Sequence, residues 1–158
     1  MKKYEILFEE LLPWFGVKGI IEVREITPPG GHRTNIIRTD QAWEVYFDFE
    51  TNGPLNYLLC GHWHLKLYLE KYGIEEYDLP GAELRLPFVS KPYRYRDKIT
   101  IPARKVPAGL YKLAASITMT GPGGIPGPVA GFAKVECLQF FDGGPISSLV
   151  PEAEQILV

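Results

Sequence analysis

Hydrophobic and polar residues alternate along most of the chain. The alternation is clearest at residues 41–51, where every second side chain is large and apolar: Trp43, Val45, Phe47 and Phe49. The residues between them are polar or carry a hydroxyl: Glu44, Tyr46, Asp48 and Glu50. Successive side chains of a β-strand point to opposite faces, so this pattern predicts a strand with one buried and one solvated face.

The same period of two recurs in seven further segments. We predict strands at 18–26, 33–39, 61–73, 82–88, 93–101, 109–120 and 129–141. Pro- and Gly-rich turns separate them, notably 28–32, 52–54 and 121–128. About eight strands with regular turn signals are typical of an all-β antiparallel sandwich. Helical segments do not alternate with the strands, which disfavours a parallel α/β sheet.

The first residues follow a different period. Apolar residues at Tyr4, Leu7, Phe8, Leu11 and Phe15 have helical spacing, and Pro13 disfavours helix at the residue before it. We therefore predict a short N-terminal helix within 1–16, a β-sandwich domain at 17–142 and a fraying tail at 143–158. The helix either packs on its own domain or docks on a partner, and the sequence leaves both open.

One late segment carries a family resemblance. In VPAGLYKLAAS (106–116), a turn with Gly is followed by a Tyr and alternating apolar residues. This stretch, within residues 99–141, resembles the late strand of immunoglobulin-like and fibronectin-like sandwiches. The resemblance implies a tyrosine corner, in which the Tyr111 hydroxyl bonds back to the turn backbone. Cys60 lies three residues before Trp63, whereas the family places its first Cys a strand earlier, so an antibody-type disulfide is not implied.

Composition narrows the classes of function. The 158 residues carry a formal net charge of −2, which disfavours a nucleic-acid footprint. Glu5, Glu9 and Glu10 interrupt any signal-peptide core, and no apolar run approaches the ~20 residues of a membrane span. We expect a cytoplasmic protein with reduced thiols and no membrane span. A Cys60–Cys137 disulfide is the less favoured alternative, and Cys137 is expected to be buried and inert.

Residues 60–64 raise the possibility of a metal site. Cys60, His62 and His64 follow period-two spacing, as the histidine pair of cupin barrels does, and His32 is the third histidine of the chain. In cupins a Glu and then a Gly follow the histidine pair, but Glu70 comes later and Gly73 earlier than that spacing requires. Zinc sites need three or four such ligands. We favour a solvated strand face whose histidines pair with Glu44, Asp48 or Glu50 on a neighbouring strand. Zinc binding by His62, His64, His32 and Cys60 is the alternative.

No residues form a recognisable catalytic motif. None of the four serines sits in a G-x-S-x-G elbow, and the loop 121–128 lacks the helix, Lys and Ser/Thr of a phosphate cradle. We therefore assign no catalytic residue and expect no cofactor.

The remaining signals favour binding. Tyr46 and Tyr68 lie on predicted solvated faces, His62 and His64 share the face of Tyr68, and Ile125 lies in the long Pro/Gly loop. We predict a non-enzymatic interaction or assembly module that binds a protein partner or itself as a homo-oligomer. A metal-binding protein or metal-dependent enzyme is the first alternative. A sugar-binding sandwich that uses tyrosines as stacking platforms is the second, although such modules mostly act outside the cell.

Overall fold

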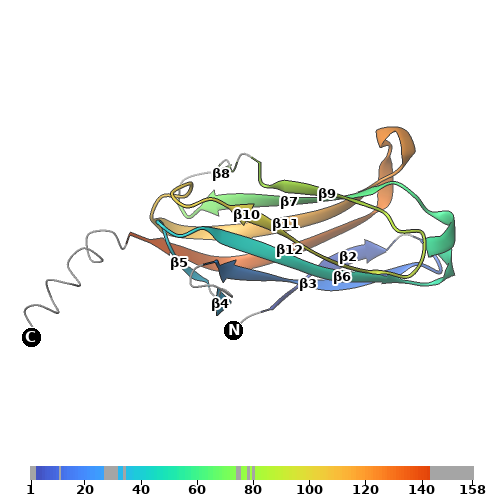
Figure 1. The fold of residues 1–158 in the computed structure, drawn as a ribbon, viewed down its shortest axis with the longest axis horizontal. Coiled ribbons are helices and arrows are strands. Elements are labelled where there is room, and N and C mark those ends of the chain that lie inside the picture. Colours follow the sequence, from blue (N-terminus) through green and yellow to red (C-terminus); the bar gives the residue numbers. More distant parts are fainter. Residues whose placement is uncertain are drawn as a thin grey trace, which may run out of the picture.

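The fold consists of two β-sheets that face each other across one hydrophobic core (Figure 1). The computed structural model describes residues 3–10, 12–26, 32–33, 35–73, 76–77, 79 and 81–142, with backbone only at Glu10, His32, Arg33 and Tyr77. The predicted tail at 143–158 and most of the predicted turn at 28–32 lie outside the described residues.

The first sheet has the strand order β1 (Tyr4–Glu5), β3 (Gly16–Glu25), β6 (Trp43–Asn52), β10 (Arg94–Ile101), with β4 (His32–Arg33) also beside β3. The second sheet has the order β2 (Leu7–Glu10), β12 (Pro126–Phe141), β11 (Gly109–Thr120), β7 (His62–Lys71), β8 (Glu76–Tyr77). In this sheet β5 (Ile36–Arg38) also pairs with β12, and β9 (Glu83–Pro87) with β7. Pairing is antiparallel except between β5 and β12. Two short 3₁₀ turns, η1 (Pro54–Leu58) and η2 (Pro122–Gly124), lie in loops.

The alternating residues form the core, as predicted. Trp43, Val45, Phe47 and Phe49 of β6 are buried, and so are Trp63, Leu65, Leu67 and Leu69 of β7. Aromatic rings cross between the sheets: Trp43 meets Phe140 edge-on at 5.2 Å between centroids, and Phe49 meets Trp63 at 5.3 Å. The all-β prediction is confirmed, and each of the eight predicted segments contains a strand.

The predicted N-terminal helix is wrong. The chain is extended there, pairs with β3 through β1, and then crosses to pair with β12 through β2. Ile6, at the crossing, is buried and donates its N–H to the carbonyl of Gly19 at 2.9 Å, whereas Leu7 points outward with 67% exposure. The edge strands of both sheets need hydrogen-bond partners, and an extended segment supplies them to each in turn, which a helix cannot do.

Two other sequence predictions concern β11 and β12. Tyr111 is fully buried and its hydroxyl donates to the carbonyl of Pro107 at 2.8 Å, which confirms the expected bond to the turn backbone.

Cys137, however, is exposed rather than buried. Between the pairs Leu113–Val135 and Tyr111–Leu138, β12 has one residue more than β11. This β-bulge shifts the alternation, so that Glu136 and Cys137 are both exposed.

None of the helices in the described part of the chain is long and apolar enough to cross a membrane.

Candidate binding surfaces

The outer face of the first sheet is a ladder of charged residues. Acidic residues of the central strand β6 lie between basic residues of β3 and β10. Asp48 accepts two hydrogen bonds from the Arg94 guanidinium, at 2.9 and 2.8 Å. Further pairs are Lys18–Glu50 at 3.4 Å, Lys98–Glu44 at 3.6 Å and Arg24–Glu22 at 2.6 Å. The charges of this face are thus largely paired within the sheet.

Two features of this face reduce the number of groups that are available to a ligand: the Asp48–Arg94 ion pair and the packing of Arg24 on Tyr46. The hydrogen bonds from Arg94 hold the pKa of the Asp48 carboxyl below its usual range, and they raise the pKa of Arg94. Tyr46 lies here half-buried, with the Arg24 guanidinium 4.5 Å from its ring centroid. Tyr46 is therefore on the opposite side of the molecule from Tyr68, and the two predicted binding tyrosines do not form one site.

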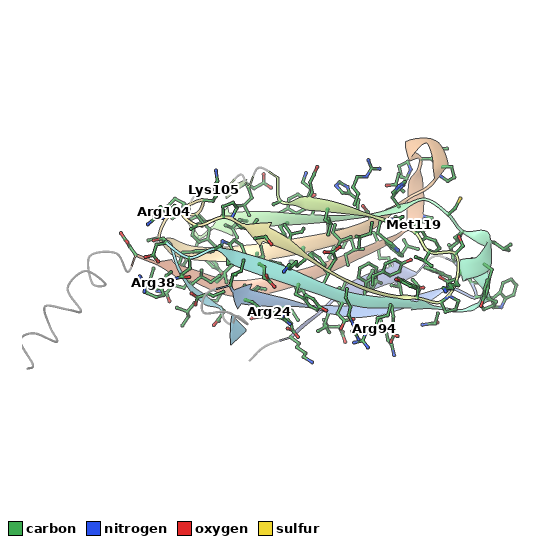
Figure 2. The ribbon with its side chains drawn as sticks, viewed as in Figure 1. Arg24, Arg38, Arg94, Arg104, Lys105 and Met119 are labelled. Carbon is green, nitrogen blue, oxygen red and sulfur yellow. The ribbon has the colours of Figure 1, made fainter. Side chains whose placement is uncertain are left out.

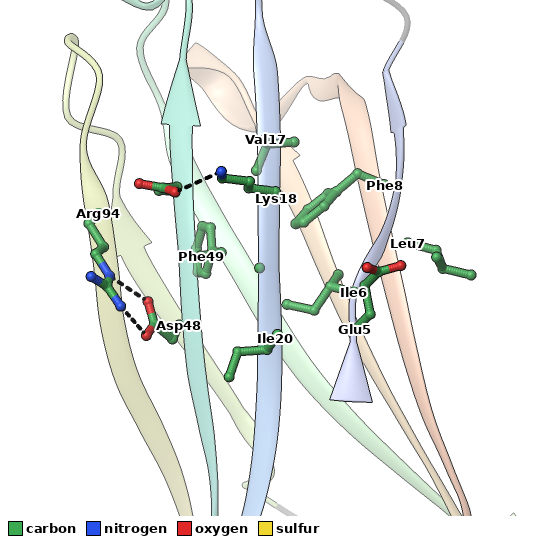
Figure 3. Close-up of a pocket in the computed structure, with 12 residues that line it drawn as sticks. Glu5, Ile6, Leu7, Phe8, Val17, Lys18, Ile20, Asp48, Phe49 and Arg94 are labelled. Atoms are coloured by element: carbon green, nitrogen blue, oxygen red, sulfur yellow. Dashed lines mark hydrogen bonds and ion pairs between the residues drawn. The ribbon is translucent and has the colours of Figure 1, made fainter. Parts of the chain in front are cut away.

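A shallow groove of about 570 Å³ opens where the N-terminal segment leaves the first sheet (Figure 3). Gly19 is one of the residues that line it, and a Cβ there would come within 2.4 Å of the Cβ of Phe49, so this position has no room for a side chain. Its walls include Phe8 and the ion pairs Lys18–Glu50 and Arg94–Asp48 (Figure 3). Ser, Thr, Cys and His are absent from the described residues that line it, and its Lys18, Asp48 and Glu50 are held in ion pairs of the sheet.

The outer face of the second sheet has a different character. At its centre lie four small side chains of β11 and β12, Ala114, Ser116, Thr118 and Ala130, and exposed Lys134 of β12 lies directly opposite Ala114. One side of this area carries Leu7, 67% exposed, directly opposite Phe132, 50% exposed. The other side carries Lys66 and Tyr68 of β7, with Tyr68 41% exposed. We call this surface, from Leu7 to Tyr68, the second-sheet face.

The predicted histidines border the second-sheet face. His62 and His64 project from β7, and His64 Nε2 lies 3.4 Å from the carboxylate of Glu83 on β9. The expected pairing with Glu44, Asp48 or Glu50 is wrong, because β6 belongs to the other sheet and β7 lies between β11 and β9.

The other predicted metal ligands do not complete a site. Cys60 is exposed in the loop before β7, and the side chain of His32 lies outside the described ones. Among the described residues, no group of three or more His, Cys, Asp or Glu side chains is placed to hold a metal ion. Cys60 and Cys137 are both free, so the alternative disulfide is not formed.

One end of the molecule carries a cluster that the sequence analysis missed. Trp14 is 74% exposed, Tyr57 64% and Leu58 80%. We call these three residues the loop tip. Trp14 lies in the segment 1–16, for which the sequence predicts a short helix that ends near Pro13. The signal that could have found the tip is the pair of apolar stretches beside proline, LPWF (12–15) and PLNYLL (54–59). Ile125, 67% exposed, lies on the β11–β12 loop at the same end (Figure 1).

Backbone contacts hold the loop tip in place. Trp14 has a left-handed backbone, with φ of 58°, which is unusual for a bulky residue and costs about 1–3 kcal/mol. Its carbonyl accepts the N–H of Leu55 at 3.1 Å. Asn56 is fully buried and donates its side-chain amide to the carbonyls of Asn52 and Gly53, at 2.8 and 2.9 Å. The tip is thus an ordered corner of the fold.

No protein-family model matches the sequence, and no curated protein is significantly similar to it. The function must therefore be inferred from the surfaces themselves.

Proposed function

We propose that this protein is a non-enzymatic binding module that holds a protein partner, or a second copy of itself, on the second-sheet face. The observation that carries the proposal is the contrast between the two outer faces. The first sheet presents charges that are largely paired with one another. The second presents exposed Leu7, Phe132 and Tyr68 around small side chains.

Each part of the second-sheet face has a role in this proposal. Leu7 and Phe132 are the apolar anchors, because large exposed side chains that become buried supply most of the energy of an interface. The small residues Ala114 and Ala130 let a partner approach the sheet closely. His64 and Lys66 form the polar rim, which contributes more to specificity than to affinity.

The fold is compatible with such a role. The immunoglobulin-like assignment that we propose for residues 99–141 rests on the Tyr111 bond to Pro107 and on the two-sheet arrangement. A rigid pair of sheets holds a binding face in a fixed shape, so that little ordering entropy is lost on association. The fold by itself does not specify the partner.

The test compares aromatic residues on opposite faces. The tagged full-length protein is captured from its own cells, the companion is identified, and its affinity is then measured with purified components; self-association is measured by analytical ultracentrifugation. Phe132→Ala and Tyr68→Ala should each weaken the interaction about tenfold, a typical cost for an interface anchor. Tyr46→Ala, on the other face, is the matched control and should leave the affinity unchanged.

Two outcomes would count against the proposal. The first is a monomer that recovers no companion at any concentration tested. The second is a companion whose affinity falls with Tyr46→Ala as much as with Phe132→Ala, which would place the interface on the first sheet.

A zinc site is the second candidate. His62 and His64 lie on the same exposed face of β7, and the Glu83 carboxylate is within reach of His64. Such a site would bind zinc stoichiometrically and lose it in the His62→Ala and His64→Ala variants. Elemental analysis of protein purified without chelator decides this: metal-free protein that gains no thermal stability on zinc addition excludes the site.

A further inference from the structure

The end of the molecule that carries the loop tip is almost free of charge. Four segments meet there: 12–15, 53–61, 88–93 and 121–126 (Figure 1). Together they contain one charged residue, Lys91, in a chain in which 23% of residues are charged. The opposite end is charged, with Arg38, Arg104 and Lys105 gathered around its loops (Figure 2).

Hydrogen bonds join three of these segments, 12–15, 53–61 and 88–93, into one surface. The N–H of Leu55 donates to the carbonyl of Trp14, and the Ser90 hydroxyl donates to the carbonyl of Leu59 at 2.6 Å. The N–H of Phe88 donates to the carbonyl of Gly61 at 2.9 Å. Lys91, next to Ser90 in sequence, is therefore held beside the loop that carries Tyr57 and Leu58.

From these observations we propose that the loop tip docks on a phospholipid membrane by inserting Trp14, Tyr57 and Leu58 into the headgroup region. Trp and Tyr are the residue types enriched at membrane–water interfaces, because their rings combine an apolar body with a polar group. Lys91, which is exposed, supplies a positive charge for the lipid phosphates. The segments of this end contain no carboxylate that those phosphates would repel.

The shape of the tip favours a membrane over a protein pocket. Side chains that are 74, 64 and 80% exposed stand clear of their neighbours. A protein partner would need three matching cavities, whereas a lipid interface deforms around the side chains. The net charge of −2 supplies no general attraction to anionic lipid. Binding is therefore expected to be modest and only weakly dependent on salt.

The protein contains its own probe for this insertion. It has three tryptophans, of which Trp43 and Trp63 are buried, so changes in emission on membrane binding report on Trp14. The full-length protein is titrated with vesicles of phosphatidylcholine, alone or mixed with phosphatidylserine. We expect a blue shift of the emission, quenching by lipids brominated in the acyl chain, and flotation of the protein with the vesicles.

Three variants make the test specific. Leu58→Asp should reduce vesicle affinity by about tenfold or more, since it removes the burial of one leucine and adds a charge. Leu110→Asp changes a leucine that is 41% exposed at the opposite end, and it should bind like the wild type. Trp14→Phe should still float with vesicles but lose the blue shift. Thermal unfolding of each variant confirms that it is folded.

Three results would overturn the proposal. One is emission that does not change with either vesicle, together with no flotation. Another is vesicle binding that Leu58→Asp leaves intact. The third is a Leu58→Asp variant that loses a protein companion while the wild type binds no vesicles, which would assign the tip to a protein partner.

Discussion

At the scale of single residues, two contacts at the turns between strands contribute to the stability of the fold. Tyr111 combines a fully buried ring, packed edge-on against Phe140 at 5.5 Å, with one hydrogen bond to Pro107. Gly53 combines a left-handed backbone, with φ of 93°, and close approach to Trp14. Both residues act where the chain turns, and a single substitution tests each of them.

Tyr111→Phe removes the hydroxyl and keeps the ring. We expect the free energy of unfolding to fall by about 1 kcal/mol, the usual net value of one hydrogen bond. Urea denaturation measures it. Tyr68→Phe is the control, because its ring is 41% exposed on the surface, and should change stability by less than about 0.5 kcal/mol. Equal stabilities of the two variants would show that the bond to Pro107 contributes nothing.

Gly53→Ala places a Cβ 2.2 Å from the carbonyl oxygen of Trp14. The turn must then shift, so we expect a loss of more than about 2 kcal/mol in the same assay. Gly123 is the matched control: its φ is 72°, but a Cβ there meets nothing within 4 Å. Gly123→Ala should cost only the backbone preference, about 1 kcal/mol. Similar losses for both glycines would contradict the close approach to Trp14.

At the scale of elements, hydrogen-bond pairing between strands outweighs the secondary structure that local hydrophobic spacing predicts. Residues 4–10 have apolar positions that suit a helix, yet they form two strand segments, one on each sheet. Across the outer face of the first sheet, pairing places carboxylates of β6 between the cations of β3 and β10. Both arrangements depend on residues far apart in the sequence.

Two adjacent residues distinguish the strand from the helix. Ile6 is buried, so Ile6→Ala should lower the free energy of unfolding by about 2–4 kcal/mol. Leu7 is 67% exposed, so Leu7→Ala should lower it by less than about 0.5 kcal/mol. The helical spacing predicts the reverse, since Leu7 and not Ile6 would face the core. Denaturation of the two variants therefore reports directly on the conformation of this segment.

The ion pair between Asp48 and Arg94 predicts a dependence of stability on pH. The folded state lowers the pKa of Asp48, so its contribution is present above the unfolded value of about 3.9 and is lost as pH falls through the folded value. We expect stability to fall below about pH 5. In Asp48→Asn, the deficit relative to the wild type should be larger at neutral pH than in acid. A deficit that does not change with pH would contradict the pairing.

At the scale of the whole molecule, one core serves both sheets while the outer surfaces differ. Rings from β6 meet rings from β7 and β12 across the core. The two outer faces differ in charge, and so do the two ends. A common core with distinct surfaces allows the second-sheet face and the loop tip to be changed separately without loss of the fold.

The shared core predicts a single cooperative unfolding transition. Tryptophan emission reports mainly on buried Trp43 and Trp63, one in each sheet, and far-UV circular dichroism reports on all strands. The two signals should have the same midpoint in urea. Separate midpoints would mean that the sheets unfold independently.

The all-β class, the position of the main strands and the inward residues within them follow from the sequence alone. Period-two alternation is a local property, and in β6, β7 and β11 the burial of every second side chain outweighs other preferences. The Tyr111 turn could be predicted for the same reason, because its bond spans only four residues.

The pairing of the strands, and with it the position of every candidate site, depends on tertiary contacts. The crossing at Ile6, the bulge that exposes Cys137 and the separation of Tyr46 from Tyr68 all depend on which strands become neighbours. The loop tip likewise combines residues 14, 57 and 58, whose two segments are linked by the hydrogen bond from the Leu55 N–H to the Trp14 carbonyl. Contacts between distant segments leave no periodic signal in the sequence, because each segment shows its own pattern and not that of its partner.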